Sequence, residues 1–193
     1  MSFLNPFRRA PSGDTWFLAG LSTSFPNITA SGTTPLSNSL PCQDSEILAP
    51  GCKVFHVPNN DSSLATGLDM NPGTATDSKE IAPASLDLRD QVVVFQYQAD
   101  FHAVDHSCPH SSYPLSKGTP FDIEDFGVRL SAGIRCPKHD WSFDLVRGNG
   151  DRGNYRLKIW ETQLRPVAGS GRSTADDKEE VKEVWVRRKQ RMG

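Results

Sequence analysis

Two short stretches near the middle of the chain, HSCPHSS (residues 106–112) and IRCPKHDW (residues 134–141), each carry a cysteine and a histidine. In both, proline follows the cysteine and biases it toward extended backbone. The first pattern is Cys-x-His, the second is Cys-x-x-His, and 25 residues lie between them. Both spacings allow a thiol and an imidazole to point to the same side of a turn. The sequence therefore predicts two rigid loops that each offer one thiolate and one imidazole.

The candidate ligands are compatible with two kinds of metal site. These ligands are Cys108, His110, Cys136 and His139. They suit one structural zinc ion, or they can be divided between the two irons of a [2Fe–2S] cluster with mixed ligation. Zinc fingers usually take both cysteines from one loop, whereas here each loop has one cysteine and one histidine. That alternation favours the cluster, and two proline-followed pairs so close together argue against a site without metal.

The residues around the two patterns resemble Rieske-type ferredoxins and the Rieske domains of oxygenases. In FHAVDHSCPHSSYPLSKG (101–118) an aromatic-x-Ala-x-Asp strand leads into Cys-x-His, and Leu-x-x-Gly follows. CPKHDWSFD (136–144) is similar to the second cluster loop, and WFLAGLSTSF (16–25) to the opening strand. The resemblance covers about residues 14–24 and 86–186 and extends to small Rieske proteins of the fungal kind. It implies one [2Fe–2S] cluster per chain, with both cysteines on one iron and both histidines on the other.

Four loop positions imply a low reduction potential. High-potential Rieske proteins of the respiratory type carry a further cysteine in each loop, joined as a disulfide, and a serine and a tyrosine that donate to the cluster. Tyr113 and Lys138 stand in place of those cysteines, Trp141 in place of the serine and Phe143 in place of the tyrosine. Fewer donors leave the more negative, reduced cluster less stabilised. We therefore expect a potential near the negative end of a range of roughly −150 to +300 mV.

Short strand-like runs separated by turn residues predict an all-β protein. They lie at residues 14–24, 52–58, 90–98, 101–107, 127–136, 141–146, 155–165 and 181–188, with a pair of short strands expected in 127–136. FDIEDFG (121–127) is expected to be a helical turn, within a connection between the cluster loops that is longer than the family usually has. The resemblance implies a Rieske-type antiparallel β-sandwich with a small cluster-binding subdomain inserted at 101–154. The sandwich strands are expected from residues 14–24, 52–58, 86–98 and 155–188.

Segments rich in Ser, Thr, Pro, Gly and charged residues predict loops and tails. Residues 1–13 are expected to be a flexible N-terminus, 14–188 the Rieske domain and 189–193 a tail. Long loops are expected at 29–50, 59–84 and 166–180. Strand-like runs bracket the last of these, so it is expected to cap a hairpin.

Composition and charge limit the classes of partner and the cellular compartments that we expect for this chain. The 193-residue chain has a net charge of −2, which gives no reason to expect a nucleic acid or an anionic membrane as partner. The apolar run WFLAGL (16–21) is far too short to span a bilayer. The first residues lack the apolar core of a secretory signal, although Arg8 and Arg9 hint at a mitochondrial presequence. We expect a cytoplasmic protein, with a mitochondrial location as the alternative.

The remaining cysteines and histidines are expected to have ordinary roles. Cys42 and Cys52 are predicted to be free thiols, with a disulfide between them as the alternative. His102 and His106 with Asp105 between them have the spacing of a mononuclear iron site. However, alternation along a strand places Asp105 on the other side from both histidines, which favours plain strand residues.

Together these features predict a monomeric one-electron carrier whose partners are redox proteins, a reductase and an acceptor such as an oxygenase. A complete Rieske oxygenase would need a second iron site with two further histidines and a carboxylate, and too few residues follow the second loop for such a domain. A structural zinc-binding module and an accessory component of an oxygenase system remain as alternatives. The basic tail RRKQR (187–191) is expected to be a solvated terminus rather than a docking site for an acidic partner.

Overall fold

The fold is all-β, as the sequence predicts. The computed structural model describes residues 15–42, 47–68, 87–167 and 181–189. Its strands are β1 (Phe17–Leu21), β2 (Asn27–Ile28), β3 (Ser39–Pro41), β4 (Leu48–Pro50), β5 (Cys52–His56), β6 (Thr66–Leu68), β7 (Gln91–Tyr97), β8 (Asp100–Asp105), β9 (Thr119–Asp125), β10 (Val128–Cys136), β11 (Trp141–Asp144), β12 (Trp160–Pro166) and β13 (Lys182–Arg188). Short 3₁₀ turns lie at η1 (Ser22–Ser24), η2 (Ser62–Leu64), η4 (Leu88–Asp90) and η5 (Leu115–Lys117).

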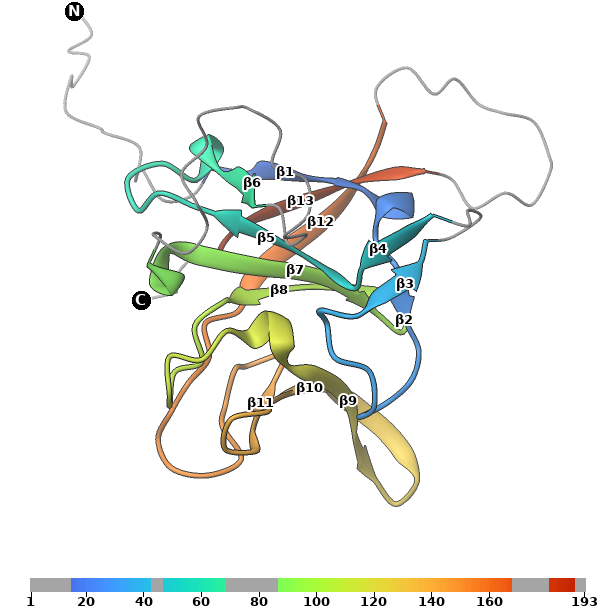
Figure 1. The fold of residues 1–193 in the computed structure, drawn as a ribbon, viewed down its shortest axis with the longest axis vertical. Helices are drawn as coiled ribbons and strands as arrows, with labels where there is room; N and C mark the ends of the chain where they lie inside the picture. Colours follow the sequence, from blue (N-terminus) through green and yellow to red (C-terminus); the bar gives the residue numbers. More distant parts are fainter. Residues whose placement is uncertain (1–14, 43–46, 69–86, 168–180, 190–193) are drawn as a thin grey trace, which may run out of the picture.

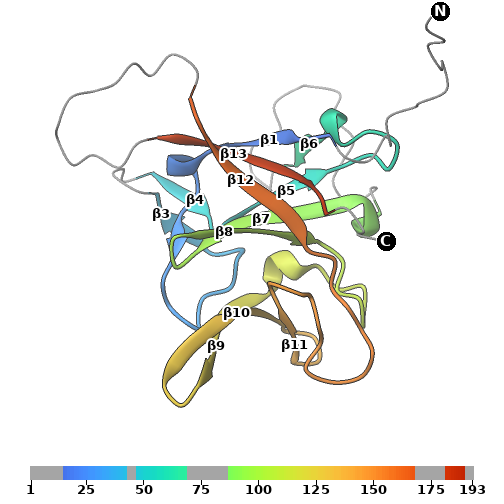
Figure 2. The same cartoon turned by 180° about the vertical axis from the view of Figure 1, so that it is seen from behind.

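The strands form stacked layers (Figures 1 and 2). A three-stranded sheet has the order β1-β13-β12, and a five-stranded sheet has the order β2-β7-β5-β6 with β8 also paired to β7. A smaller sheet has the order β11-β10-β9. It lies on the side of the five-stranded sheet that faces away from the three-stranded sheet, and it carries the cluster loops (Figure 1). The strand pairs are antiparallel apart from the short pair of β2 and β7.

Strand β7 explains how the layers hold together. All seven of its residues are buried, because one face packs on the three-stranded sheet and the other on the cluster-binding part. Val92 and Val94 share a core with Phe17 of β1, whereas Val93 and Phe95 belong to the core that contains both loop cysteines. A strand covered on both faces has a continuous apolar sequence instead of an alternating one, which is what the run VVVF shows.

The expected helical turn at 121–127 is wrong. Strand β9 runs from Thr119 to Asp125 and pairs with β10, and the turn at Phe126–Gly127 has φ values of 49° and 75°. The Asp, Glu and Gly residues of this segment are weak strand formers on their own, so the pairing with β10 decides the conformation. The expected pair of short strands in 127–136 is instead the single strand β10, with a register shift between Arg129 and Ser131.

Several expected boundaries change. The loop predicted at 29–50 contains β3 and β4, and the described part of the loop at 59–84 contains η2 and β6. Strand β12 begins at Trp160 rather than near residue 155. The expected start of the cluster-binding subdomain, residue 101, falls inside β8, which is part of the five-stranded sheet.

Other expectations lie partly outside the described residues. Strands β12 and β13 pair antiparallel, so the segment between them connects a hairpin as predicted, while residues 168–180 themselves lie outside the description. The predicted N-terminal segment 1–13 and tail residues 190–193 also lie outside it. Cys42 and Cys52 are free thiols, and burial raises the pKa of Cys52 to about 12.

Candidate metal centre

The first loop is closed by its own backbone. Strand β8 leads directly into it, and an isolated bridge pairs Ser107 with Pro114. The Cys108 N–H donates to the Tyr113 carbonyl at 2.9 Å, and the Ser112 N–H donates back to the Cys108 carbonyl at 2.8 Å. Ser112 adopts a positive φ of 51°, which turns the chain sharply after His110. The loop therefore holds its cysteine and histidine in a fixed turn.

The second loop is the tip of a hairpin. Strands β10 and β11 pair so that Cys136 lies opposite Trp141, and residues 137–140 connect them. Asp140 has a positive φ of 55°, and its carbonyl accepts a hydrogen bond from Arg152 Nη2 at 2.8 Å. The hairpin register fixes the position of Cys136, and the contact with Arg152 supports the residue that follows His139.

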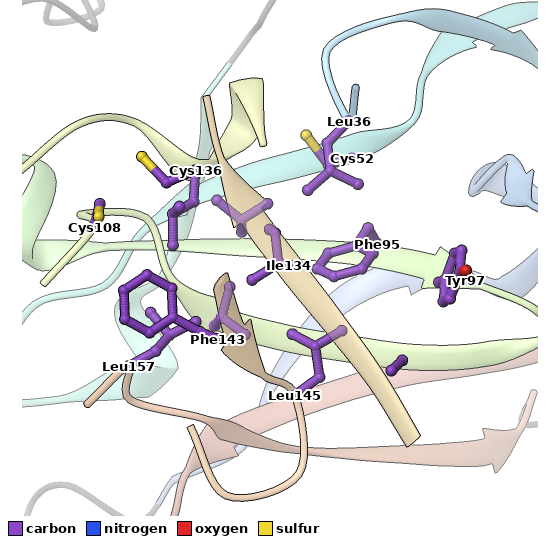
Figure 3. Close-up of a cluster of buried hydrophobic side chains, with 14 of the residues drawn as sticks. Leu36, Cys52, Phe95, Tyr97, Cys108, Ile134, Cys136, Phe143, Leu145 and Leu157 are labelled. Carbon is purple, nitrogen blue, oxygen red and sulfur yellow. The ribbon is translucent and has the colours of Figure 1, made fainter. Parts of the chain in front are cut away.

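The two cysteines lie next to each other inside the protein. Cys108 and Cys136 are each 1% exposed, and Figure 3 shows their sulfurs at the same end of a buried apolar cluster, near Phe143 and Leu157. Burial raises the pKa of the Cys136 thiol, and the neighbouring Cys108 raises it further, while the Lys138 N–H lowers it. Two adjacent buried thiolates need a cation to balance their charge, which suits metal ligands.

The two histidines meet at the surface side of these thiols. The rings of His110 and His139 have centroids 5.1 Å apart, at an angle of 67°. His110 is half-buried, whereas His139 is exposed. The Nδ1 atom of His110 is buried and has no hydrogen-bond partner in the described part of the chain. Since buried polar atoms nearly always have a partner, this nitrogen fits the role of a metal ligand.

The arrangement separates into a pair of thiols and a pair of imidazoles. Among the described residues, no three Cys, His, Asp or Glu side chains come together in the way that one metal ion requires. A structural zinc ion takes four ligands at one centre, whereas a [2Fe–2S] cluster with mixed ligation needs two at each of two irons. The predicted ligands lie in two pairs, Cys108 with Cys136 and His110 with His139.

Comparison with known proteins agrees with this geometry. Residues 72–158, which include all four candidate ligands, match the family model described as the Rieske [2Fe-2S] domain. The chain contains a Rieske domain. Domains of this family bind a [2Fe–2S] cluster.

Two curated relatives match the chain around this domain. A human "Rieske domain-containing protein" is 42% identical over 60 residues, which is 31% of this chain and 35% of that protein. The "Methanesulfonate monooxygenase ferredoxin subunit" of Methylosulfonomonas methylovora is 34% identical over 74 residues, 36% of this chain and 54% of the subunit. The chain therefore spans at most about half the length of these relatives. Within the described residues, no helix is long and apolar enough to cross a membrane.

Aromatic side chains cover one face of the Rieske loops. The Trp141 ring stacks on His110 at 4.3 Å and 19°, and Tyr155 meets both rings edge-on at 5.0 and 5.2 Å. The Arg152 guanidinium lies over the Trp141 ring, 5.3 Å from its centroid. No sequence pattern pointed to Tyr155 or Arg152, because only the fold brings residues 152–155 back to the cluster loops.

A hydroxyl near the cysteines was also missed from the sequence. Ser111 Oγ lies 4.0 Å from Cys136 Sγ, within the range of a weak hydrogen bond to sulfur. Trp141 and Phe143 supply no hydroxyl at their positions, as expected, and Ser111 adds a hydroxyl at a position that was not considered. The signal was present in the sequence, since Ser111 directly follows the candidate ligand His110.

The residues that suggested a mononuclear iron site have structural roles. His106 is buried, with Nδ1 2.7 Å from Gln91 Oε1 and Nε2 2.8 Å from Ser116 Oγ, and so ties the first loop to β7. Asp105 instead accepts a hydrogen bond from Trp160 Nε1 at 2.8 Å. The two side chains therefore use different partners, and Asp105 ends β8 whereas His106 follows it at the start of the first loop.

His102 makes the stability of the Rieske domain depend on pH. Burial lowers its pKa from 6.5 to about 4, with Arg129 lowering it further and Asp100 opposing. The folded state keeps this imidazole neutral, so below pH 6.5 the unfolded state binds more protons. We expect the free energy of unfolding to fall as pH decreases from 6.5 toward 4, by up to about 3 kcal/mol from this group.

Urea denaturation at a series of pH values measures this effect, with His102→Phe as the comparison. Phe95 lies 5.5 Å from the imidazole ring, so a second phenylalanine fits the site chemically. The variant should lose about 2–3 kcal/mol less than the wild type between pH 6.5 and pH 4. Equal losses in the two proteins would contradict the assignment.

Proposed function

We propose that this Rieske domain is a one-electron carrier, with Cys108 and Cys136 holding one iron of the cluster and His110 and His139 the other. The observation that carries the proposal is the pairing of two adjacent buried thiols with two imidazoles near the surface. When bound, a cluster of this kind accepts and returns one electron. The protein's own contribution is to hold the four side chains in two closed loops and to exclude water from the sulfurs.

The likeness to a ferredoxin subunit supports electron delivery to an oxygenase. The bacterial relative is named as the ferredoxin subunit of a methanesulfonate monooxygenase. We infer that this chain serves a reductase and an acceptor in the same manner, as a carrier or as an accessory component of an oxygenase system. Because the sulfurs are buried and His139 is exposed, the electron would be exchanged at the end of the molecule formed by the two loops.

The surroundings of the loops support a low reduction potential. Phe143 is 1% exposed and belongs to the same buried cluster as both cysteines. Its ring carries no hydroxyl that could donate to the cluster. Tyr113 and Lys138 do not form a disulfide but a cation–π contact at 5.9 Å. Ser111 supplies one hydroxyl near Cys136. An apolar setting with few donors disfavours the additional negative charge of the reduced state.

Phe143→Tyr is expected to raise the midpoint potential. A new hydroxyl beside the cysteines would stabilise the reduced state more than the oxidised one, and a difference of about 1 kcal/mol corresponds to about 40 mV for one electron. A spectroscopic redox titration measures the change. Phe121→Tyr is the control, because Phe121 is half-buried in the same small sheet but outside the core that holds the cysteines, and its midpoint should stay within about 10 mV. An unchanged or lower midpoint in the first variant would count against the account.

The positive charge at the end of the molecule formed by the two cluster loops predicts which oxidants react fastest. Segments 106–118, 134–141 and 151–155 carry four Lys and Arg against two Asp, whereas the whole chain has a net charge of −2. Lys117 and Lys138 both lie 5.9 Å from the centroid of the Tyr113 ring, and neither forms an ion pair among the described residues. A partner with an acidic docking surface fits this end.

Stopped-flow oxidation of the reduced protein tests both where the electron leaves the protein and the charge of that surface. The anion ferricyanide should react with a rate constant that falls as ionic strength rises, whereas hexaamminecobalt(III) should show the opposite trend. Lys117→Ser with Lys138→Ser should slow the ferricyanide reaction by about threefold or more at low salt. Arg89→Ser with Arg147→Ser removes the same charge elsewhere and should have a smaller effect. Equal effects of the two double variants would place the exit elsewhere.

A further inference from the structure

A concave site that the electron-carrier function does not use lies beside the end of β13. Its cavity is about 640 Å³, and its basic lining residues are Arg89, Arg147, Arg156, Lys158, Arg188 and Lys189. These residues come from η4, from the segment between β11 and β12, and from the end of β13. Strand β13 ends beside η4 in both views (Figures 1 and 2). The basic tail expected to be a solvated terminus is thus, at Arg188 and Lys189, one wall of a cavity.

The cavity has a large excess of positive charge. Asp105 is the one carboxylate among its described lining residues, and it is already engaged by Trp160 Nε1 at 2.8 Å and by Lys158 Nζ at 3.5 Å. Arg188 is held in place by Asn59 Oδ1 at 3.0 Å and the Val57 carbonyl at 3.2 Å, while its buried Nε atom has no hydrogen-bond partner among the described residues. Six cations around one occupied carboxylate favour an anion from outside the chain.

Two arginines at the rim are free to reach such an anion. Arg147 is exposed and its side chain forms no ion pair among the described residues. Its backbone N–H donates to Asp144 Oδ2 at 3.0 Å, and its carbonyl accepts from Arg156 Nε at 3.1 Å. The Arg89 side chain is 80% exposed and pairs with Asp87 at 3.6 Å, an exposed contact of little strength. Arginine binds phosphate in a bidentate manner that lysine cannot reproduce.

The lining also contains an apolar part. Val146, Leu157, Ile159 and Trp160 contribute to the same cavity, and Leu157 and Trp160 are buried. Small-molecule sites usually combine an apolar lining with a few charged groups, in volumes of roughly 300–1,000 Å³. Water alone or a bare inorganic ion would use only the charged part of this lining.

We propose that this cavity binds a small organic phosphate, a molecule with an apolar body and a dianionic phosphate group. The arginines at the rim hold the phosphate, and the apolar residues contact the body of the molecule. This site is separate from the cluster loops, so binding of the phosphate does not depend on the electron-carrier function.

Isothermal titration calorimetry on the full, cluster-loaded chain tests the proposal with three probes. 1-Naphthyl phosphate carries both features, inorganic phosphate carries only the charge, and 1-naphthol carries only the apolar body. We expect one molecule of 1-naphthyl phosphate per chain, bound about tenfold more tightly than either of the other probes. Equal or tighter binding of 1-naphthol, or no saturable binding of 1-naphthyl phosphate, would overturn the proposal.

Matched variants locate the bound probe. Arg89→Ser with Arg147→Ser should weaken 1-naphthyl phosphate by about tenfold, whereas Lys117→Ser with Lys138→Ser, which removes the same charge at the cluster end, should change the affinity by less than about twofold. If the double variant does not fold, Arg147→Ser alone should weaken binding by about threefold. Equal weakening by both double variants would show that net charge, and not this cavity, determines binding, and would also overturn the proposal.

Discussion

Replacement of Cys136 by serine is expected to give a protein that no longer binds a [2Fe–2S] cluster. The Cys136 thiol is 1% exposed and lies beside Cys108, so a serine hydroxyl would occupy the same position without supplying a thiolate for iron. Iron and acid-labile sulfide should fall to background, and the visible absorption of the cluster should disappear. This is the largest functional effect that we expect from one substitution.

Cys42→Ser is the matched control for this prediction. Cys42 is a free, half-buried cysteine next to β3 and contacts the Ile47 carbonyl through its backbone N–H, at 3.1 Å. It lies outside both cluster loops, so the variant should retain the full iron and sulfide content. Retention of the cluster in Cys136→Ser, or its loss in Cys42→Ser, would contradict the assignment of ligands.

The largest loss of stability is expected from Gly148→Ala. Gly148 has a φ of +76° and closes the turn after β11, where its N–H donates to the Asp144 carbonyl at 2.9 Å. An added Cβ would collide with the Leu157 carbonyl oxygen. This is a backbone atom, so it cannot move aside without shifting the segment between β11 and β12. We expect the free energy of unfolding to fall by about 3 kcal/mol or more.

Gly127→Ala separates the collision from the effect of φ alone. Gly127 has nearly the same φ, +75°, but lies at the exposed tip of the β9–β10 hairpin, where an added Cβ meets nothing within 4 Å. Its substitution should lower the free energy of unfolding by about 1–2 kcal/mol, the usual penalty for a left-handed conformation. Chemical denaturation of both variants measures the two values. If the two losses were equal, the close approach at Leu157 would have no energetic role.

The ligand loops were predictable from sequence because their chemistry is local. Each pattern places a cysteine and a histidine within four residues, and each following proline restricts the cysteine before it. The buried run VVVF likewise identified β7, since a strand covered on both faces needs apolar residues on both. In both cases a short segment contains all the information that its structure requires.

The parts that could not be predicted depend on contacts between distant segments. FDIEDFG becomes strand β9 only because β10 pairs with it, and the long connection between the cluster loops is this hairpin. Tyr155 reaches His110 only because the segment between β11 and β12 folds back over the first loop. The basic cavity is likewise assembled from segments around residues 89, 147, 156 and 188. No local sequence pattern predicts such contacts between distant segments.

A redox titration monitored by electron paramagnetic resonance tests whether the protein carries one electron on a [2Fe–2S] cluster held by two cysteines and two histidines. We expect two irons and two sulfides per chain, and a signal that appears on uptake of one electron. We also expect nitrogen couplings from two histidines, one of which is lost in His110→Cys and the other in His139→Cys. The midpoint should lie near the negative end of the range of roughly −150 to +300 mV. A colourless protein with one zinc ion, or a midpoint above about +100 mV, would contradict these expectations.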